Sequence, residues 1–174
     1  METILEIIKI SASGVLVLIA TYILINRMFE NAERKRYFEL RKEAAKTLDP
    51  IRLNAYERLT LLLERLRPDA LILRIQFPGI TAHDLHMAIL TTIREEFDHN
   101  VTQQIYVSGD AWIMVKGSKD HLIQFVNTIA SQVPDNIPGI ELGKIIIQKY
   151  EEIEGATPIE AALEGLKREV KTMQ

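Results

Sequence analysis

Apolar residues form one long run near the start of the chain and then recur at helical spacing. From Ile10 to Asn26 there are 17 residues without a charged side chain. As a helix this run covers about 25 Å, slightly less than the roughly 30 Å hydrocarbon core of a bilayer. Ile4 on one side and Phe29 on the other extend the apolar surface. The pattern predicts an uncleaved transmembrane anchor in a first segment, residues 1–26.

A cleaved signal peptide and a buried core helix are the two other interpretations of this run. A signal peptide needs a basic start and small residues at its cleavage site. Residues 1–9 instead contain two glutamates and a single Lys9, and the run ends in Asn26 and Arg27. The length of the run favours an anchor over a core helix.

Basic residues are distributed unevenly on the two sides of the predicted anchor. Residues 27–46 carry seven Lys and Arg, against one in residues 1–9. Loops rich in Lys and Arg stay on the cytoplasmic side of a membrane. We therefore expect a single-pass protein of the bacterial inner membrane, with its N-terminus outside and its C-terminal domain in the cytoplasm. The lipid bilayer is its first expected partner, because the basic side chains would face anionic headgroups.

Beyond the anchor, apolar residues recur at steps of three, four and four. The positions are Tyr37, Leu40, Ala44, Leu48, Ile51, Ala55, Leu59, Leu62 and Leu66. This eleven-residue repeat averages about 3.67 residues per turn, close to the value of a straight helix. It predicts a long helix with one apolar face, which comprises a charged juxtamembrane segment, residues 27–49, and the start of a cytoplasmic domain, residues 50–174. Pro50 predicts a kink or brief break near this boundary, and Pro68 the end of the helix.

Two kinds of contact are open for the apolar face of this helix. In the first, residues 50–66 pack only against the body of the same chain. In the second, residues 28–66 also pack against other copies, in a homo-oligomer related to a coiled coil.

The cytoplasmic domain is expected to be compact and mainly helical. Thr81 and Thr157 are typical N-caps and predict two helix starts. Helices are expected after Thr81 and at residues 110–116, 119–132 with Ser118 as N-cap, 140–152 and 158–170. Expected core residues include Trp112, Ile113, Val115, Leu122, Ile123, Phe125, Val126 and Ile129. Segments 71–77 and 103–107 are too short for periodicity to distinguish a two-stranded element from helix or coil.

Composition excludes several classes of protein. The chain has no Cys, which rules out disulfides and Cys-ligated metals. Residues 47–174 hold 13 basic and 18 acidic side chains, so we expect no nucleic-acid partner. Phosphate-binding and nucleophile-elbow motifs are missing from the sequence. We therefore expect no enzyme activity, no cofactor and no small-molecule substrate.

One polar cluster keeps a metal-dependent membrane-associated enzyme as the alternative. His83 and His86 are three residues apart, and Glu96 and His99 have the spacing found in carboxylate-bridged diiron bundles. Such bundles need a second Glu-x-x-His, and His121 has no acidic residue three positions earlier. The simpler interpretation places His83 and His86 on the surface and pairs His99 with the end of its helix.

Five stretches carry recognisable motifs. They are LNAYERLTL at 53–61, ER at 64–65, IREEFDHN at 93–100, QQIYVS at 103–108 and AW at 111–112. These stretches resemble a family of small single-pass membrane proteins of the Bacteroidota whose function is unknown. The resemblance covers most of the chain; it implies the architecture described above and no catalytic residues.

Polar residues of these motifs, together with one tryptophan, form the candidate site. They are Tyr56, Glu57, Arg58, Arg94, Glu96, His99, Asn100, Gln104 and Trp112. The polar groups either cap the helix end and join it to the long helix through the charge of Arg58 or Arg94, or form a docking face for another protein. Trp112 is expected in the core. The predicted function is a membrane-anchored scaffold, adaptor or accessory subunit of a protein complex, without enzyme activity.

Overall fold

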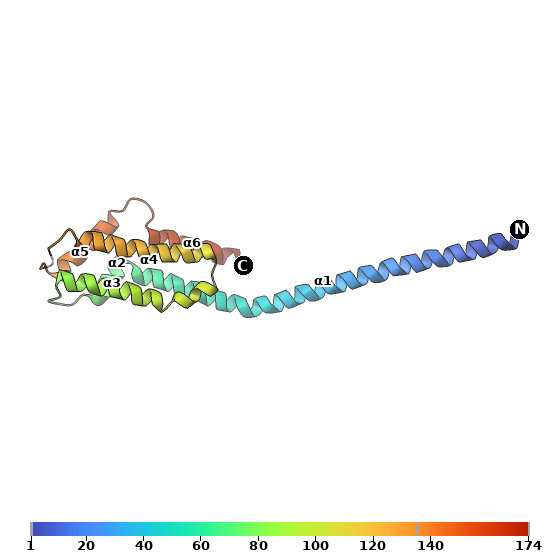
Figure 1. Ribbon diagram of the computed structural model, residues 1–174, viewed down its shortest axis with the longest axis horizontal. Helices are drawn as coiled ribbons and strands as arrows, with labels where there is room; N and C mark the ends of the chain where they lie inside the picture. The colour runs from blue at the N-terminus through green and yellow to red at the C-terminus, as the bar shows by residue number, and fades with distance from the viewer. Residues whose placement is uncertain (1, 135, 174) are drawn as a thin grey trace. The chain divides into compact units, whose positions relative to one another are not determined.

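Helices account for nearly all the regular structure of the protein. The computed structural model describes residues 2–134 and 136–173, except for the side chains at positions 2–13, 15–17 and 20. The elements are α1 (Glu2–Leu66), α2 (Pro68–Ile75), α3 (Ala82–Asp98), the 3₁₀ helix η1 (Val101–Ile105), α4 (Gly109–Ala130), α5 (Gly139–Glu151) and α6 (Pro158–Thr172) (Figure 1). The described residues contain no strand. The mainly α fold class is therefore confirmed.

The chain divides into two compact units, Met1–Leu48 and Asp49–Gln174. The second unit, called the body below, contains the C-terminal part of α1 and all later elements. In the described residues, no helix combines the length and apolar character that crossing a membrane requires. Most side chains of the predicted anchor, residues 1–26, lie outside the described residues, so the anchor stays a prediction.

Helix α1 passes through Pro50 without interruption. The expected alternative of a brief break there is wrong. A proline in this position removes one hydrogen bond, the one that its nitrogen would donate to the Lys46 carbonyl group. Five residues later Ala55 is fully buried in the body, as is Leu59. This packing holds the turns that follow the proline in helical conformation.

The positions of the eleven-residue pattern differ in burial between the two parts of α1. Ala55, Leu59, Leu62 and Leu66 are all buried, as expected for packing against the body of the same chain. Tyr37, Leu40, Leu48 and Ile51 are exposed. Packing of the helix on its own body is thus confirmed from Ala55 onward.

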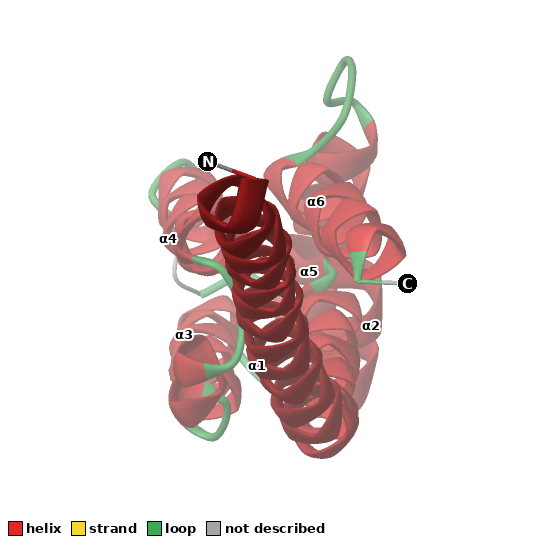
Figure 2. Cartoon of the chain, turned by 90° about the vertical axis from the view of Figure 1, so that its right-hand side faces the viewer, coloured by secondary structure: helices red, strands yellow, loops and turns green. Residues whose placement is uncertain are grey.

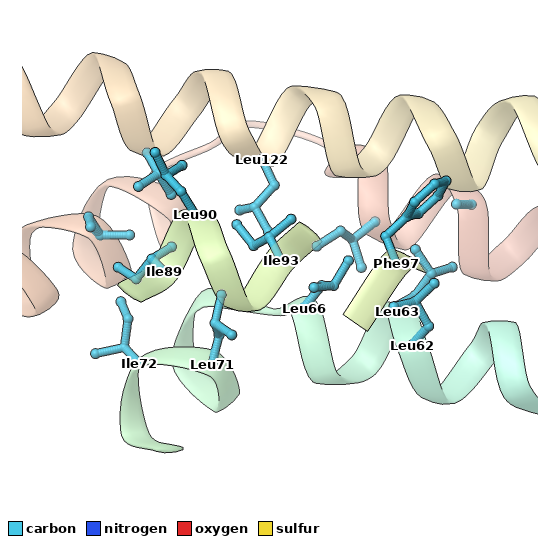
Figure 3. Packing of buried hydrophobic residues seen from close by; sticks show 14 of the residues in the cluster. Leu62, Leu63, Leu66, Leu71, Ile72, Ile89, Leu90, Ile93, Phe97 and Leu122 are labelled. Atoms are coloured by element: carbon cyan, nitrogen blue, oxygen red, sulfur yellow. The ribbon is translucent and has the colours of Figure 1, made fainter. Parts of the chain in front are cut away.

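The core of the body is built from one face of every helix. Helix α3 packs against α4 and α5, α4 against α6, and α2 against α3 and α5. Figure 2 shows α3 and α4 on one side of the body and α2 and α6 on the other. Leucines of α1 and α2 meet Ile89, Ile93 and Phe97 of α3 and Leu122 of α4 in the centre (Figure 3). This apolar cluster supplies the burial that a domain of this size needs.

Neither of the two segments left open, 71–77 and 103–107, forms a strand, and most of each is helical. Residues 71–75 belong to α2, where Pro68 takes the first turn and Leu71 and Ile72 are buried. Residues 103–105 lie in η1, with Gln103 as its buried residue. The two-stranded alternative is therefore wrong. Proline at a helix start pre-sets the backbone angle, and this outweighs the β-branched content of so short a segment.

The helix starts were predicted well at four places and wrongly at one. Thr81 and Thr157 cap α3 and α6, and α4 and α5 begin at Gly109 and Gly139, each one residue before the expected position. Ser118, however, lies inside a continuous α4. Its hydroxyl is buried 2.8 Å from both the Met114 and the Pro158 carbonyl oxygens, so it joins α4 to the start of α6.

The expected core of this region is right except at one position. Val115, Leu122, Val126 and Ile129 are buried, and Trp112, Ile123 and Phe125 are partly buried against the core. Ile113 is 68% exposed. With α4 as one unbroken helix, Ile113 lies on the face away from Val115 and Leu122, which explains the error.

Candidate binding site around the 3₁₀ helix

Several predicted site residues converge on the turn between α3 and α4, which contains η1. The Asn100 side-chain amide donates to the Glu96 carbonyl oxygen at 2.8 Å and closes the end of α3. From α1, Arg58 Nη2 donates to the His99 carbonyl oxygen at the end of α3, at 3.4 Å. These contacts join the end of α3 to α1.

The Glu96 carboxylate is held by two arginines that were not among the predicted residues. Arg65 donates to Glu96 Oε1 through Nε at 2.9 Å and Nη2 at 2.5 Å, and Arg74 Nη1 donates to the same oxygen at 3.2 Å. Arg74 also contacts the Arg65 carbonyl oxygen. Arg65 follows Arg58 by seven residues, so both arginines lie on one face of α1, and this spacing was the available signal. Of the two arginines expected to join the helix end to α1, Arg58 contacts His99, while Arg94 is exposed.

A second carboxylate, that of Glu169 in α6, joins three elements. The buried Tyr56 hydroxyl donates to Glu169 Oε2 at 2.7 Å, and the Ser108 hydroxyl donates to Oε1 at 2.5 Å. Ser108 also accepts from the Ala111 backbone N–H as the N-cap of α4. Burial raises the pKa of Tyr56, and the neighbouring Glu169 carboxylate raises it further. Glu169 was not predicted, since 113 residues separate it from Tyr56.

Between α1 and η1 lies an open pocket of about 540 Å³, called the α1/η1 pocket below. It is lined by Pro50, Ile51, Asn54, Arg58, Thr102, Gln103, Ile105 and Tyr106. Asn54 and Arg58 stand one helical turn apart, so both project from the same side of α1. On the opposite wall Gln103 is only 7% exposed, and its amide donates to the Thr102 hydroxyl at 3.3 Å. Arg52 Nε fixes the far end of that wall by donating to the Tyr106 carbonyl oxygen at 3.3 Å.

The polar side chains of the α1/η1 pocket suit binding. Arg, Asn, Gln and Thr offer hydrogen-bond donors and acceptors but do not exchange protons near neutral pH. The pocket can therefore hold and orient a polar ligand.

Of the predicted site residues, Arg58 alone is among those that line this pocket. Glu57, Arg94 and Gln104 are exposed on the surface. Trp112 is partly buried, with its ring centroid 5.2 Å from that of Phe97. It packs against the core, as expected, and keeps some contact with solvent.

The residues of the metal-site alternative have other contacts. His86 Nε2 lies 2.7 Å from the Asn127 side-chain oxygen, and Glu96 is engaged by Arg65 and Arg74. His83 is exposed at the start of α3. Within residues 2–134 and 136–173, no three His, Asp or Glu side chains were found in an arrangement that could hold a metal ion.

Comparison with known proteins places this architecture in a family. A family model described as "Family of unknown function (DUF7935)" matches residues 2–173. The chain belongs to this family. Membership over nearly the whole chain confirms the expected relationship to a family of unknown function; it says nothing about a membrane or about a group of organisms. No curated protein and no solved structure matches the chain.

Proposed function

We propose that this member of the DUF7935 family is a membrane-anchored, non-enzymatic adaptor or accessory subunit of a protein complex. Its body, Asp49–Gln174, would bind a partner protein on the cytoplasmic side of the inner membrane. The observation that carries the proposal is the α1/η1 pocket, in which residues of two separate sequence motifs form one polar surface suited to binding. Confinement to a membrane raises the effective concentration of whatever the body binds.

Membrane attachment is the part of the proposal that rests on sequence alone. Its support is the run of 17 uncharged residues from Ile10 to Asn26 and the seven basic residues that follow in 27–46. The chain contains no Cys, so single cysteines introduced by Thr3→Cys or Gln174→Cys can be labelled without a background. In spheroplasts, whose inner membrane is intact, an impermeant maleimide should label the Thr3→Cys variant and not the Gln174→Cys variant. Labelling of the latter alone would reverse the orientation, and recovery of the intact chain without detergent would refute the anchor.

Partner binding is tested by cross-linking in native membranes followed by mass spectrometry. We expect cross-links between a second protein and lysines of the body, Asp49–Gln174, such as Lys116. Cross-links between copies of this chain at residues 27–48 would instead indicate a self-associating scaffold, since Tyr37, Leu40 and Leu48 are exposed there. Cross-links confined to a single chain would refute both forms of the proposal.

A further inference from the structure

We infer that the α1/η1 pocket recognises a carboxylate in an acidic peptide of the partner protein, with Arg58 as the residue that receives the negative charge. The inference rests on the proposed adaptor function and names the chemistry of its partner. It follows from the state of Arg58, from the donors around it and from the apolar rim of the pocket.

Arg58 differs from Arg65 and Arg74 in how its charge is balanced. Arg65 and Arg74 share the Glu96 carboxylate. Among the described residues, no carboxylate lies within ion-pair distance of the Arg58 guanidinium. Arg58 donates one long hydrogen bond, of 3.4 Å, to the His99 carbonyl oxygen. A guanidinium has five N–H donors in a planar fork, so Arg58 can still bind a carboxylate through two parallel hydrogen bonds.

The groups beside Arg58 complete a site for a polar anion. Asn54 lies one turn earlier on the same helix, and Thr102 and Gln103 line the opposite wall. The Gln103 side chain is held in place by burial and by its bond to Thr102. Side chains fixed before binding lose little entropy when a ligand arrives.

The rim of the pocket indicates what surrounds the carboxylate. Ile51 is 41% exposed and Ile105 is 71% exposed, and both line the pocket. Aliphatic groups on the ligand would cover these side chains and remove their surface from water. A volume of about 540 Å³ is also larger than one carboxylate needs. An acidic residue with aliphatic neighbours in a peptide fits these features better than a free inorganic anion.

A singly charged group fits better than a phosphate. The pocket lining contains one charged side chain, that of Arg58. Phosphate carries close to two negative charges at neutral pH and is usually met by several cations. Residues 47–174 are acidic, with 13 basic and 18 acidic side chains. Its field opposes a dianion more strongly than a monoanion.

Binding of a defined peptide to the full-length chain in detergent micelles tests the inference. The probe is a short fluorescein-labelled peptide with one Asp between two Leu, and its partner probe has Asn in place of Asp. Fluorescence anisotropy should show the Asp peptide binding at least about tenfold more tightly, because a hydrogen bond to a charged group contributes that much or more. Arg58→Gln should abolish the difference, and Arg58→Lys, which keeps the charge without the planar fork, should retain part of it.

Arg94→Gln is the matched control, since Arg94 is an exposed arginine outside the pocket. Equal binding of the Asp and Asn peptides, no binding of either, or an equal loss in the Arg94→Gln variant would overturn the inference. Competition by free N-acetylaspartate as strong as that of the peptide would also overturn it and indicate a small-molecule site. Circular dichroism melting of Arg58→Gln shows whether a loss of the preference for the Asp peptide reflects unfolding. If this variant is unfolded, Asn54→Ala must reduce the same preference for the inference to stand.

The adaptor function itself can fail or survive separately. If the cross-links to a second protein persist in Arg58→Gln cells, the adaptor proposal stands and the pocket is the wrong site. If the wild-type chain gives no such cross-links, the adaptor proposal fails whatever the peptide does.

Discussion

Replacing Tyr56 by Phe isolates one hydrogen bond between distant parts of the body. The Tyr56 hydroxyl is buried and donates to Glu169 Oε2 at 2.7 Å. A net hydrogen bond to a charged acceptor contributes about 1.5–3 kcal/mol to stability. Glu169 is only half-buried and keeps its second bond, from Ser108, so the lower end of that range applies. We expect Tyr56→Phe to lower the free energy of unfolding by about 1.5 kcal/mol.

Urea unfolding followed through the fluorescence of Trp112, the single tryptophan, measures this change. For a domain of this size the melting temperature should fall by about 5 °C. Tyr37→Phe is the matched control, because Tyr37 lies on the same helix with an exposed ring and should change stability little. A loss below about 0.5 kcal/mol, or equal losses in the two variants, would refute the argument. In a Glu169→Gln background the effect of Tyr56→Phe should shrink, since the charged acceptor is gone.

The same contact predicts a dependence on alkaline pH. The pKa of Tyr56 is raised from its ordinary value of 10.0, first by burial and then by Glu169. The folded state therefore holds this proton more tightly than the unfolded state. The stabilisation of the folded state that results from this difference in pKa is complete below pH 10, and it is lost as the pH rises through the folded-state pKa. Above pH 10 the stability of the wild type should fall more steeply than that of Tyr56→Phe. Burial also raises the pKa of Tyr150, but that residue is common to both proteins.

Two further pairs of substitutions test the packing. A Cβ at Gly139 would lie 2.7 Å from Ile80 Cγ2 and 2.9 Å from the Ile80 carbonyl oxygen, whereas one at Gly117 would meet no atom within 4 Å. Gly139→Ala should therefore cost about 1–3 kcal/mol in urea unfolding and Gly117→Ala should add about 0.5–1 kcal/mol; a gain at Gly139 would contradict the close approach. Leu62→Ala should cost about 2.7–5 kcal/mol because Leu62 is buried, while Leu40→Ala, at a position of the same pattern that is 67% exposed, should change unfolding little. A large loss at Leu40 would indicate that another surface covers it.

Local signals in the sequence predicted most of the helices. Thr81 accepts from the Asp84 backbone N–H, and Thr157 forms a reciprocal capping box with Glu160, as their side chains and spacing indicate. Such contacts form within three residues and need no other part of the chain. The error at Ser118 has the same origin. A serine resembles an N-cap in sequence, but inside α4 its hydroxyl bonds to the Met114 and Pro158 carbonyl oxygens instead.

The candidate site was predicted in outline and completed by residues from distant positions. Arg58, His99 and Asn100 were identified from their motifs, and they lie near the same turn. Arg65 and Ser108 stand in these motifs but were not named as site residues, and Arg74 and Glu169 lie outside them; these four residues form the pairs around Glu96 and Tyr56. Each of these pairs forms only if the two helices that carry it become neighbours. The paired residues are 22 to 113 positions apart in the sequence, and no local pattern indicates which helices will be adjacent.

The amino-acid sequence by itself determined the helical class, the start of most helices and the face of α1 that becomes buried, because capping and periodicity act over a few residues. Tertiary structure decided that burial along that face begins at Ala55. It also decided which arginines pair with which carboxylates, and that α1 and η1 line a common pocket. The reason is physical: a hydrophobic stripe specifies only that a face avoids water, whereas the partner that covers it depends on the packing of the whole core.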